Sequence, residues 1–314
     1  MLDPGVAPEI ADWCGLGAAA TLTGPVARGE LGQIWKLETS LGRWAVKEPF
    51  DRVSEPEAEE GAAFQDAARR AGVPTPGVVR GRDGEVLMAV GPGQLSVQTW
   101  VDLREPTREL DPVAIGSLVA ALHLVPFAGR QPVHPWYVDP VGAARWEELV
   151  VALDAAGAPF AMRLRELRDE LVAVEQLLTP PRHLRTCHRD LFADNLRVTA
   201  DGDLCVIDWD NCGLADPGQE LALVLYEFGD GEPGRARALY DAYRACGGPG
   251  RIEEPSDFSM LVAQIGHLGE RAVQLWLEAA SPPAREDCVG RVEEFLGDPV
   301  TRARIDGLLD AISS

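Results

Sequence analysis

The pattern of apolar and polar residues divides the chain into a strand-rich first part and a mainly helical second part. Residues 23–38 have the pattern of two strands joined by a glycine-containing turn, and a turn at residues 40–43 leads to a strand that ends at Lys47. Further strands are predicted at residues 85–90 and 95–101, separated by the turn Gly91-Pro92-Gly93. We therefore expect an antiparallel sheet in the first hundred residues.

Helical spacing of apolar residues begins at residues 57–71, where Gly72 and the prolines after it end the helix. Similar spacing predicts helices at residues 113–124, 221–228 and 259–279. Gly266 and Gly269 weaken the last prediction, because glycine has a low helix propensity.

A constellation of polar residues lies in the second part, in the sequence His188-Arg189-Asp190-Leu191-Phe192-Ala193-Asp194-Asn195. An apolar strand at residues 204–207 follows and ends at Asp208, eighteen residues after Asp190. Phosphoryl transfer from ATP needs a carboxylate near the attacking hydroxyl and oxygen ligands for magnesium, and this spacing is that of a kinase catalytic loop and metal-binding strand. We predict that Asp190 acts on the acceptor hydroxyl and that Asn195 and Asp208 hold Mg²⁺. The alternative is a chance tripeptide followed by an aspartate that merely ends a strand.

Lys47 strengthens the kinase interpretation, because an ammonium group at the end of this strand can neutralise phosphates. The glycines before it lack the G-x-G-x-x-G spacing, so the turn alone is equally compatible with an ordinary hairpin. Glu60, on the inward face of the helix at residues 57–71, is the predicted partner of Lys47, with Glu57 as the alternative. A solvated acid in the first helical turn is the other interpretation of either glutamate.

These pieces resemble the aminoglycoside phosphotransferase family, within the choline-kinase-like and protein-kinase-like superfamily. The resemblance spans residues 23–222 and rests on the Lys47 strand, the helix ending at residues 71–76, residues 118–124, the catalytic loop, residues 206–209 and residues 216–222. The chain departs from the family in carrying Arg189 where glycine is usual and Glu220 where aspartate is frequent. Trp209-Asp210 replaces Phe-Gly and no A-P-E motif follows, which disfavours a protein kinase.

The resemblance implies an α+β, two-lobed, protein-kinase-like fold. A small N-terminal lobe with an antiparallel sheet would occupy residues 1–101 and bind the nucleotide, and a larger helical lobe would occupy residues 102–314. ATP, with GTP as an open alternative, and Mg²⁺ would bind between the lobes. The adenine would lie against backbone groups of Thr99, Trp100 and Val101, although Trp100 could instead be part of the core.

The same resemblance places the acceptor among the C-terminal helices. The candidate substrate residues are polar groups that follow the metal-binding strand or lie on those helices: Asp210, Asn211, Glu227, Asp230 and Glu270. Each could instead be a solvated surface group. The expected acceptor is an aminoglycoside or related cationic antibiotic, and an amino sugar, a choline-like molecule or an amino-acid alcohol is the alternative. A protein kinase and a catalytically silent nucleotide-binding protein are the remaining hypotheses.

Composition adds limits on partners and location. The formal net charge of −21 argues against nucleic acid as a partner and would attract a small cationic acceptor. No run of about 18 apolar residues is present, so no membrane span is expected. Residues 1–13 lack the pattern of a secretory signal, and the six cysteines have no metal-binding spacing, which predicts a cytoplasmic protein with reduced thiols. Nothing in the sequence indicates the oligomeric state.

Overall fold

The computed structural model describes residues 2–29 and 31–313, which form two compact units. Unit 1 contains the described residues up to Thr107, together with Leu124–Gln131 and Ala193–Gly213. Unit 2 contains Arg108–His123, Pro132–Phe192 and the described residues from Leu214 onward. The lobe limits expected from the sequence, residues 1–101 and 102–314, stay a prediction.

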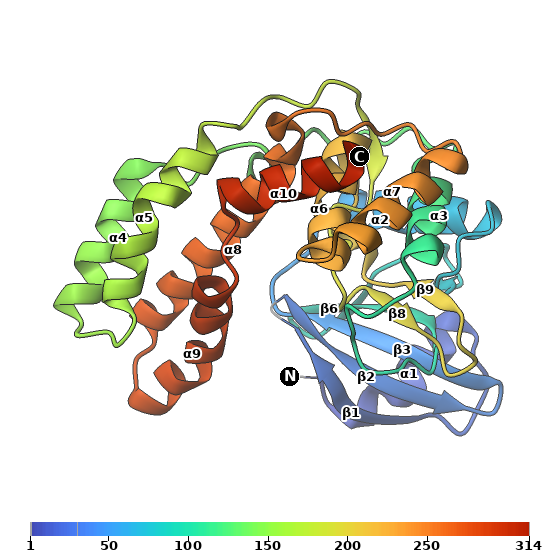
Figure 1. Ribbon diagram of the computed structural model, residues 1–314. Coiled ribbons are helices and arrows are strands. Elements are labelled where there is room, and N and C mark those ends of the chain that lie inside the picture. Colours follow the sequence, from blue (N-terminus) through green and yellow to red (C-terminus); the bar gives the residue numbers. More distant parts are fainter. Residues whose placement is uncertain (1, 30, 314) are drawn as a thin grey trace. The chain divides into compact units, whose positions relative to one another are not determined.

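Unit 1 is built on an antiparallel sheet with the strand order β1-β2-β3-β6-β4, in which β5 pairs with β6 (Figure 1). The strands of this sheet are β1 (Thr21–Arg28), β2 (Gly32–Thr39), β3 (Gly42–Pro49), β4 (Val78–Val79), β5 (Met88–Val90) and β6 (Gly93–Thr99). The hairpins predicted from residues 23–47 are therefore present; Glu30, in the first predicted turn, lies outside the described residues.

One face of this sheet carries the core of unit 1. Leu37, Val46 and Val97 are buried there against Ile10 of α1 (Ala7–Cys14), which follows a short 3₁₀ turn η1 (Pro4–Val6). Successive side chains of a strand point to opposite faces, so Lys47 projects from the face opposite Val46. Lys47 lies opposite Ile34 of β2 and Ser96 of β6 in the two ladders, which places it in the interior of the sheet.

Unit 1 also contains α2 (Glu55–Arg70), the hairpin of β8 (Leu196–Val198) and β9 (Leu204–Val206), and the 3₁₀ turn η3 (Trp209–Asn211). Ser54 caps α2 by accepting a hydrogen bond from Glu57 N–H at 3.3 Å. Phe64 of α2 contacts the rings of Phe127 and Trp209, with centroid distances of 5.3 and 5.5 Å. These contacts hold α2 beside the turn that follows β9.

Unit 2 is mainly helical, and a two-stranded pairing of β7 (Arg185–Cys187) with β10 (Gly213–Ala215) joins its catalytic loop to the segment before α6. Its helices are α3 (Pro112–His123), η2 (Pro135–Tyr137), α4 (Ala143–Ala155), α5 (Ala161–Glu175), α6 (Pro217–Gly229), α7 (Pro233–Ala245), η4 (Pro255–Phe258), α8 (Ser259–Glu278), α9 (Pro282–Gly297) and α10 (Arg302–Ser313).

The helices α4, α5, α8 and α9 lie side by side around one apolar cluster that includes Trp146, Phe160 and Trp276 (Figure 1). The two glycines that weakened the prediction of α8 do not interrupt it. A Cβ atom at Gly269 would collide with the ring of Phe295 on α9, so this glycine permits the close approach of two helices. Burial of the apolar face outweighs the low helix propensity of glycine here.

The antiparallel sheet and the helical remainder confirm the predicted α+β class. None of the helices within residues 2–29 and 31–313 combines the length and the apolar character that crossing a bilayer requires.

Candidate functional site

Residues 188–192 of the catalytic-loop sequence lie in unit 2, directly after β7, and two helices hold their backbone. Arg189 has φ of +66°, in the left-handed region that side chains other than glycine rarely adopt. Its N–H donates to Glu220 Oε1 on α6, and its carbonyl accepts from Gln264 Nε2 on α8 at 3.1 Å. The same amide nitrogen of Gln264 lies 3.4 Å from Asp190 Oδ1. The direction in which Asp190 presents its carboxylate therefore depends on α6 and α8.

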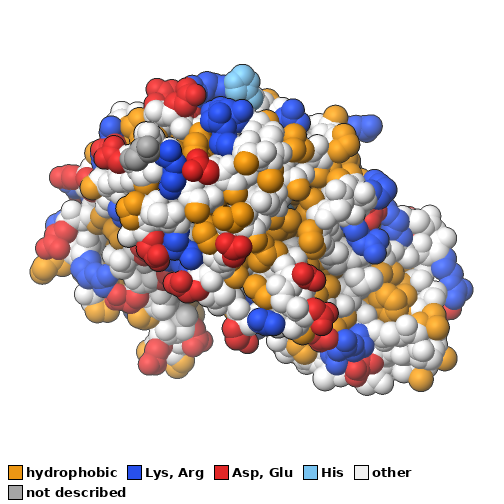
Figure 2. Space-filling view, turned by 45° about the vertical axis from the view of Figure 1, so that its right-hand side comes forward, with side chains coloured by type: hydrophobic (Ala, Val, Ile, Leu, Met, Phe, Trp, Pro, Cys, Tyr) orange, Lys and Arg blue, Asp and Glu red, His pale blue; other side chains and the backbone are white. Residues whose placement is uncertain are grey.

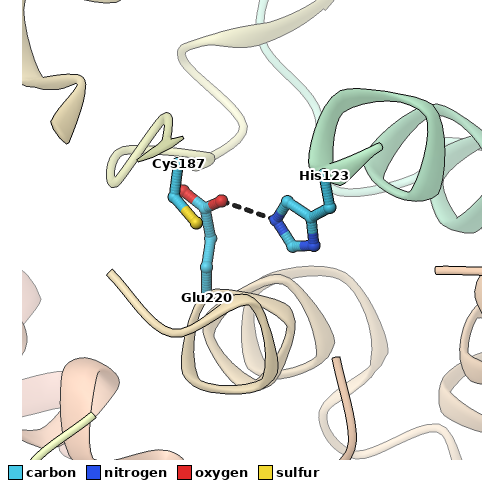
Figure 3. A group of neighbouring side chains, drawn as sticks. All are labelled: His123, Cys187 and Glu220. Atoms are coloured by element: carbon cyan, nitrogen blue, oxygen red, sulfur yellow. Dashed lines mark hydrogen bonds and ion pairs between the residues drawn. The ribbon is translucent and has the colours of Figure 1, made fainter. Parts of the chain in front are cut away.

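Glu220 is fully buried, and it connects the catalytic loop to α3 directly and to α7 through His123. Figure 3 shows its contact with His123. Its Oε2 lies 2.7 Å from His123 Nε2, and His123 Nδ1 lies 2.8 Å from the hydroxyl of Tyr243. Burial by itself would raise the pKa of Glu220, but the hydrogen bond and charge of His123 outweigh burial and hold this pKa below its ordinary value. Glu220 therefore remains an anionic acceptor for the Arg189 N–H.

Cys187 completes a group of potential metal ligands with His123 and Glu220, whose ligand atoms all lie within 4.8 Å of one another (Figure 3). Each of these atoms already has a protein partner, since Cys187 Sγ lies 3.8 Å from the carbonyl oxygen of Ala215. Burial raises the pKa of the Cys187 thiol well above its ordinary value, so the thiolate that a metal needs is disfavoured. We assign this cluster to anchoring the catalytic loop.

The predicted metal ligands lie in unit 1 at one end of the β8–β9 hairpin. Asn195 directly precedes β8 and Asp208 follows β9, while Leu196 and Val206 lie opposite each other in the ladder. The Ile207 N–H donates to the Asn195 carbonyl at 2.9 Å, which extends the pairing to Asn195 itself and to the residue before Asp208. Carboxylate and amide oxygens at one hairpin end fit a hard cation such as Mg²⁺.

Lys47 lies with two aspartates rather than with a glutamate of α2. Its Nζ is 2.7 Å from Asp208 Oδ1 and 2.7 Å from Asp210 Oδ2. Burial lowers the pKa of Lys47, but the charges of Asp210 and Asp208 outweigh burial and raise it above its ordinary value. Lys47 is therefore a permanently charged group beside the predicted metal ligand. Asp208 itself has φ of +59°, a strained conformation of the kind found at functional sites.

The predicted pairing of Lys47 with Glu60, or with Glu57, is not formed among the described residues. Glu60 Oε1 accepts hydrogen bonds from the backbone N–H groups of Arg130 and Gln131 at 2.6 and 3.0 Å. Glu57 is exposed in the first turn of α2. Two backbone donors thus satisfy Glu60, and the carboxylate of Asp210 lies next to Lys47 instead.

The predicted adenine-binding residues lie at the end of β6 in unit 1. The Thr99 N–H donates to Gly77 O at 2.8 Å and the Trp100 N–H donates to Arg43 O at 3.1 Å, so both peptide donors are already used. No acceptor for the Val101 N–H is found among the described residues. Trp100 is half-buried and its indole N–H donates to Asp102 at 2.8 Å, so the alternative of plain core packing does not describe it.

The predicted substrate residues are divided between the two units. Asp210 and Asn211 belong to η3 of unit 1, and Asp210 is paired with Lys47. In unit 2, Arg108 bridges Glu227 at 3.0 Å and Asp298 at 3.1 Å, and Arg304 Nε donates to Asp230 at 2.8 Å.

Glu270, on α8, belongs to a separate network in which it accepts from Arg145 Nε at 2.9 Å. The three substrate candidates in unit 2, Glu227, Asp230 and Glu270, therefore each have an arginine partner. The face in Figure 2 likewise shows acidic and basic side chains interspersed, and the net negative charge is not gathered there in one acidic patch.

Two residues that contact Arg189 and Asp190 were not predicted from the sequence, namely Gln264 and Tyr137. Gln264 contacts Asp190, and the guanidinium group of Arg189 lies 4.6 Å from the ring centre of Tyr137 in η2. A signal existed for Gln264, since it is a polar residue that follows the apolar residues 260–263 on the buried part of a predicted helix. No sequence signal connects Tyr137 with Arg189, because 52 residues separate them and only the fold brings them together.

Comparisons with known proteins agree with the fold described above and with the predicted family. A model of the phosphotransferase enzyme family matches residues 24–255 of the chain. A crystal structure of spectinomycin phosphotransferase APH(9)-Ia with ADP and spectinomycin has a similar fold, with a TM-score of 0.69 and 12% identity over 99% of this chain and 98% of that chain. No curated protein matches the chain.

Two further solved structures are similar in fold. The aminoglycoside phosphotransferase from Alicyclobacillus acidocaldarius gives a TM-score of 0.63 and 17% identity over 100% of this chain and 97% of that chain. The microcompartment-associated aminopropanol kinase gives a TM-score of 0.57 and 18% identity over 92% of this chain and 95% of that chain. At these identities the likeness shows a shared fold.

Proposed function

Because the chain belongs to the phosphotransferase enzyme family, whose members transfer phosphoryl groups to hydroxyl groups of small molecules, we propose that it phosphorylates a small cationic alcohol with ATP as donor. The observation that carries this proposal is the group formed by Lys47, Asp208 and Asp210, which puts a charged ammonium 2.7 Å from each of two carboxylates at the end of the β8–β9 hairpin. Such a group suits the phosphates and the metal of a nucleotide.

The donor side of the reaction uses residues of unit 1. Lys47 binds phosphate oxygens, and Asn195 and Asp208 hold Mg²⁺, with Asp210 as a further oxygen donor beside them. Bound Mg²⁺ would neutralise the negative charge that develops on the transferred phosphoryl group. The Val101 N–H, which has no acceptor among the described residues, is the donor we assign to the adenine edge.

The acceptor side uses Asp190. Its carboxylate orients the acceptor hydroxyl and takes up the proton as the new oxygen–phosphorus bond forms. The bond between the γ-phosphorus and the bridging oxygen breaks, and ADP leaves. The buried contacts of Arg189 with Glu220 and Gln264 keep the neighbouring backbone in one conformation, which suits a residue that must meet the hydroxyl in a defined geometry.

The acceptor class is supported by the net charge of −21 and by the chemistry of similar structures. We propose an aminoglycoside or related cationic antibiotic, since a similar fold binds spectinomycin in APH(9)-Ia. A small amino-alcohol metabolite is the second candidate, because an aminopropanol kinase also has this fold. The arginine partners of Glu227, Asp230 and Glu270 mean that an incoming ammonium group must exchange with a guanidinium group at any of these acids.

A direct test is ATP consumption with saturating Mg²⁺ and a panel of aminoglycosides, spectinomycin, amino sugars and amino alcohols, with neutral sugars as controls. Mass spectrometry of each product locates the added phosphate. We expect phosphorylation of at least one amine-bearing alcohol and none with the Asp190→Asn variant. Turnover restricted to neutral sugars would refute the cationic acceptor, and absence of turnover with every alcohol would refute the phosphotransfer proposal for this chain.

A further inference from the structure

We propose that Gln264 of α8 is a positioning residue for Asp190. The inference rests on the proposed function, in which the Asp190 carboxylate acts on the acceptor hydroxyl. Gln264 holds both the carboxylate and the peptide group that precedes it. It lies 74 residues beyond Asp190 in the chain and outside every motif by which the catalytic loop was recognised.

The contacts of Gln264 show that its amide acts as a donor. Nε2 lies 3.1 Å from the Arg189 carbonyl oxygen and 3.4 Å from Asp190 Oδ1, so its two hydrogens have acceptors on consecutive residues. The side chain is only 3% exposed, and no partner for its Oε1 is found among the described residues. A buried amide that uses its donors on the loop and leaves its acceptor unused points to a role in holding Asp190.

The conformation of Arg189 explains why such a residue is needed. A side chain at φ of +66° is disfavoured relative to ordinary backbone conformations, and glycine would adopt it without this penalty. Glu220 holds the N–H of Arg189 and Gln264 holds its carbonyl, so hydrogen bonds fix both peptide groups that flank the strained residue. The guanidinium group, 4.6 Å from the ring centre of Tyr137, adds a contact that only a cationic side chain can make.

Helix α8 is a firm support for this contact. The Ser259 hydroxyl, at its first turn, donates to Ser256 O at 2.6 Å. One turn after Gln264, His267 Nε2 lies 3.0 Å from Asp139 O, and Gly269 packs closely on Phe295 of α9. The helix is therefore held on several sides, and Gln264 connects Asp190 to this fixed helix.

The test compares Gln264→Met with the matched change Gln274→Met on the same helix. Methionine keeps the approximate volume and flexibility of glutamine and removes both donors. Gln274 hydrogen-bonds to Arg145 and Glu278, and no hydrogen bond joins it to the catalytic loop among the described residues. We expect Gln264→Met to lower kcat about 10- to 100-fold, the size expected when a hydrogen bond to a charged group is lost, with the KM for ATP unchanged. Gln274→Met should leave kcat within about twofold, because the hydrogen bonds that it loses go to Arg145 and Glu278 and not to the catalytic loop. Any effect that passes through Arg145 to the candidate acceptor residue Glu270 should appear in the KM of the acceptor.

A third variant separates positioning from packing. Gln264→Glu keeps the shape and volume of the side chain and replaces the donor beside Asp190 with an acceptor, so a positioning role predicts that it loses at least as much kcat as Gln264→Met. A packing role predicts that Gln264→Glu retains more kcat than Gln264→Met, and that order would overturn the proposal, as would a wild-type kcat in Gln264→Met.

Hydrogen exchange gives a readout that is independent of any acceptor. The peptide covering residues 186–191 should exchange faster in Gln264→Met than in wild type or Gln274→Met, at temperatures where all three remain folded by circular dichroism. Unchanged exchange there would count against the role of Gln264. A wild-type protein that phosphorylates no alcohol would refute the proposed function, while the exchange experiment would still decide whether Gln264 holds the loop.

Discussion

Removing the carboxylate of Glu220 should strongly destabilise the protein, because it is a buried acceptor for two donors. Glu220 is fully buried, and it accepts hydrogen bonds from the Arg189 N–H and, at 2.7 Å, from His123 Nε2. In Glu220→Ala these donors stay buried without an acceptor. Leaving a buried donor without its acceptor costs about 1–3 kcal/mol, and more when the lost acceptor was charged, so two such donors together cost about 3–5 kcal/mol. Each kcal/mol lowers the Tm of a chain of this size by about 2 °C, so we expect a decrease of about 6–10 °C.

The measurement is thermal unfolding by calorimetry, with Glu220→Gln as the matched control. Glutamine keeps the shape and one acceptor oxygen for the Arg189 N–H, so its destabilisation should be smaller than that of alanine. A decrease of less than about 2 °C for Glu220→Ala, the change expected for about 1 kcal/mol, would refute the reasoning that this carboxylate is a buried anchor.

Lowering the pH should also test the role of Glu220, because the stability of the fold depends on pH where a pKa differs between the folded and unfolded states. The pKa of Glu220 is lower in the folded protein than its ordinary value of 4.5. Its charged form therefore stabilises the fold above that ordinary pKa, and this stabilisation is lost as the pH falls below 4.5 toward the folded pKa. Wild type should consequently lose more stability than Glu220→Gln when the pH is lowered through this range. Parallel losses in the two proteins would show that Glu220 does not titrate with unfolding.

Three other predictions concern the reaction itself. Asp190→Asn should reduce kcat about 100- to 10,000-fold while calorimetry still detects Mg-ATP binding, because the carboxylate acts on the acceptor; turnover near wild type would remove Asp190 from the mechanism. Asp208→Ala should weaken Mg-ATP binding more than Asp190→Asn does, because it removes a predicted metal ligand and one of the partners of Lys47; equal affinity of Asp208→Ala and wild type in calorimetry would contradict the assignment. For a cationic acceptor, kcat/KM at saturating Mg-ATP should fall between roughly 0.01 and 0.1 M salt as the screening length shortens from about 30 to 10 Å, and a flat profile would argue for a neutral acceptor.

The sequence alone determined the hairpins of unit 1, four of the helices and the family of this protein. Alternation of apolar residues predicted the hairpins that end at Lys47, and helical spacing predicted α2, α3, part of α6 and α8. These patterns are local, since a strand or a helix repeats every few residues and its buried face leaves a periodic trace. The spacing of Asp190, Asn195 and Asp208 is likewise local, because a short loop and one hairpin separate the residues. Chemistry that depends on neighbours in the chain could therefore be predicted.

Tertiary structure alone decided which side chains meet. Lys47 lies beside Asp208 and Asp210, although the sequence favoured a glutamate of α2, and Glu60 instead binds the backbone of Arg130 and Gln131. Gln264 reaches Asp190 across 74 residues of sequence. Periodicity shows that a face is buried but not which partner covers it, because a partner is chosen by packing and hydrogen bonding among distant segments. That choice exists only once the chain has folded.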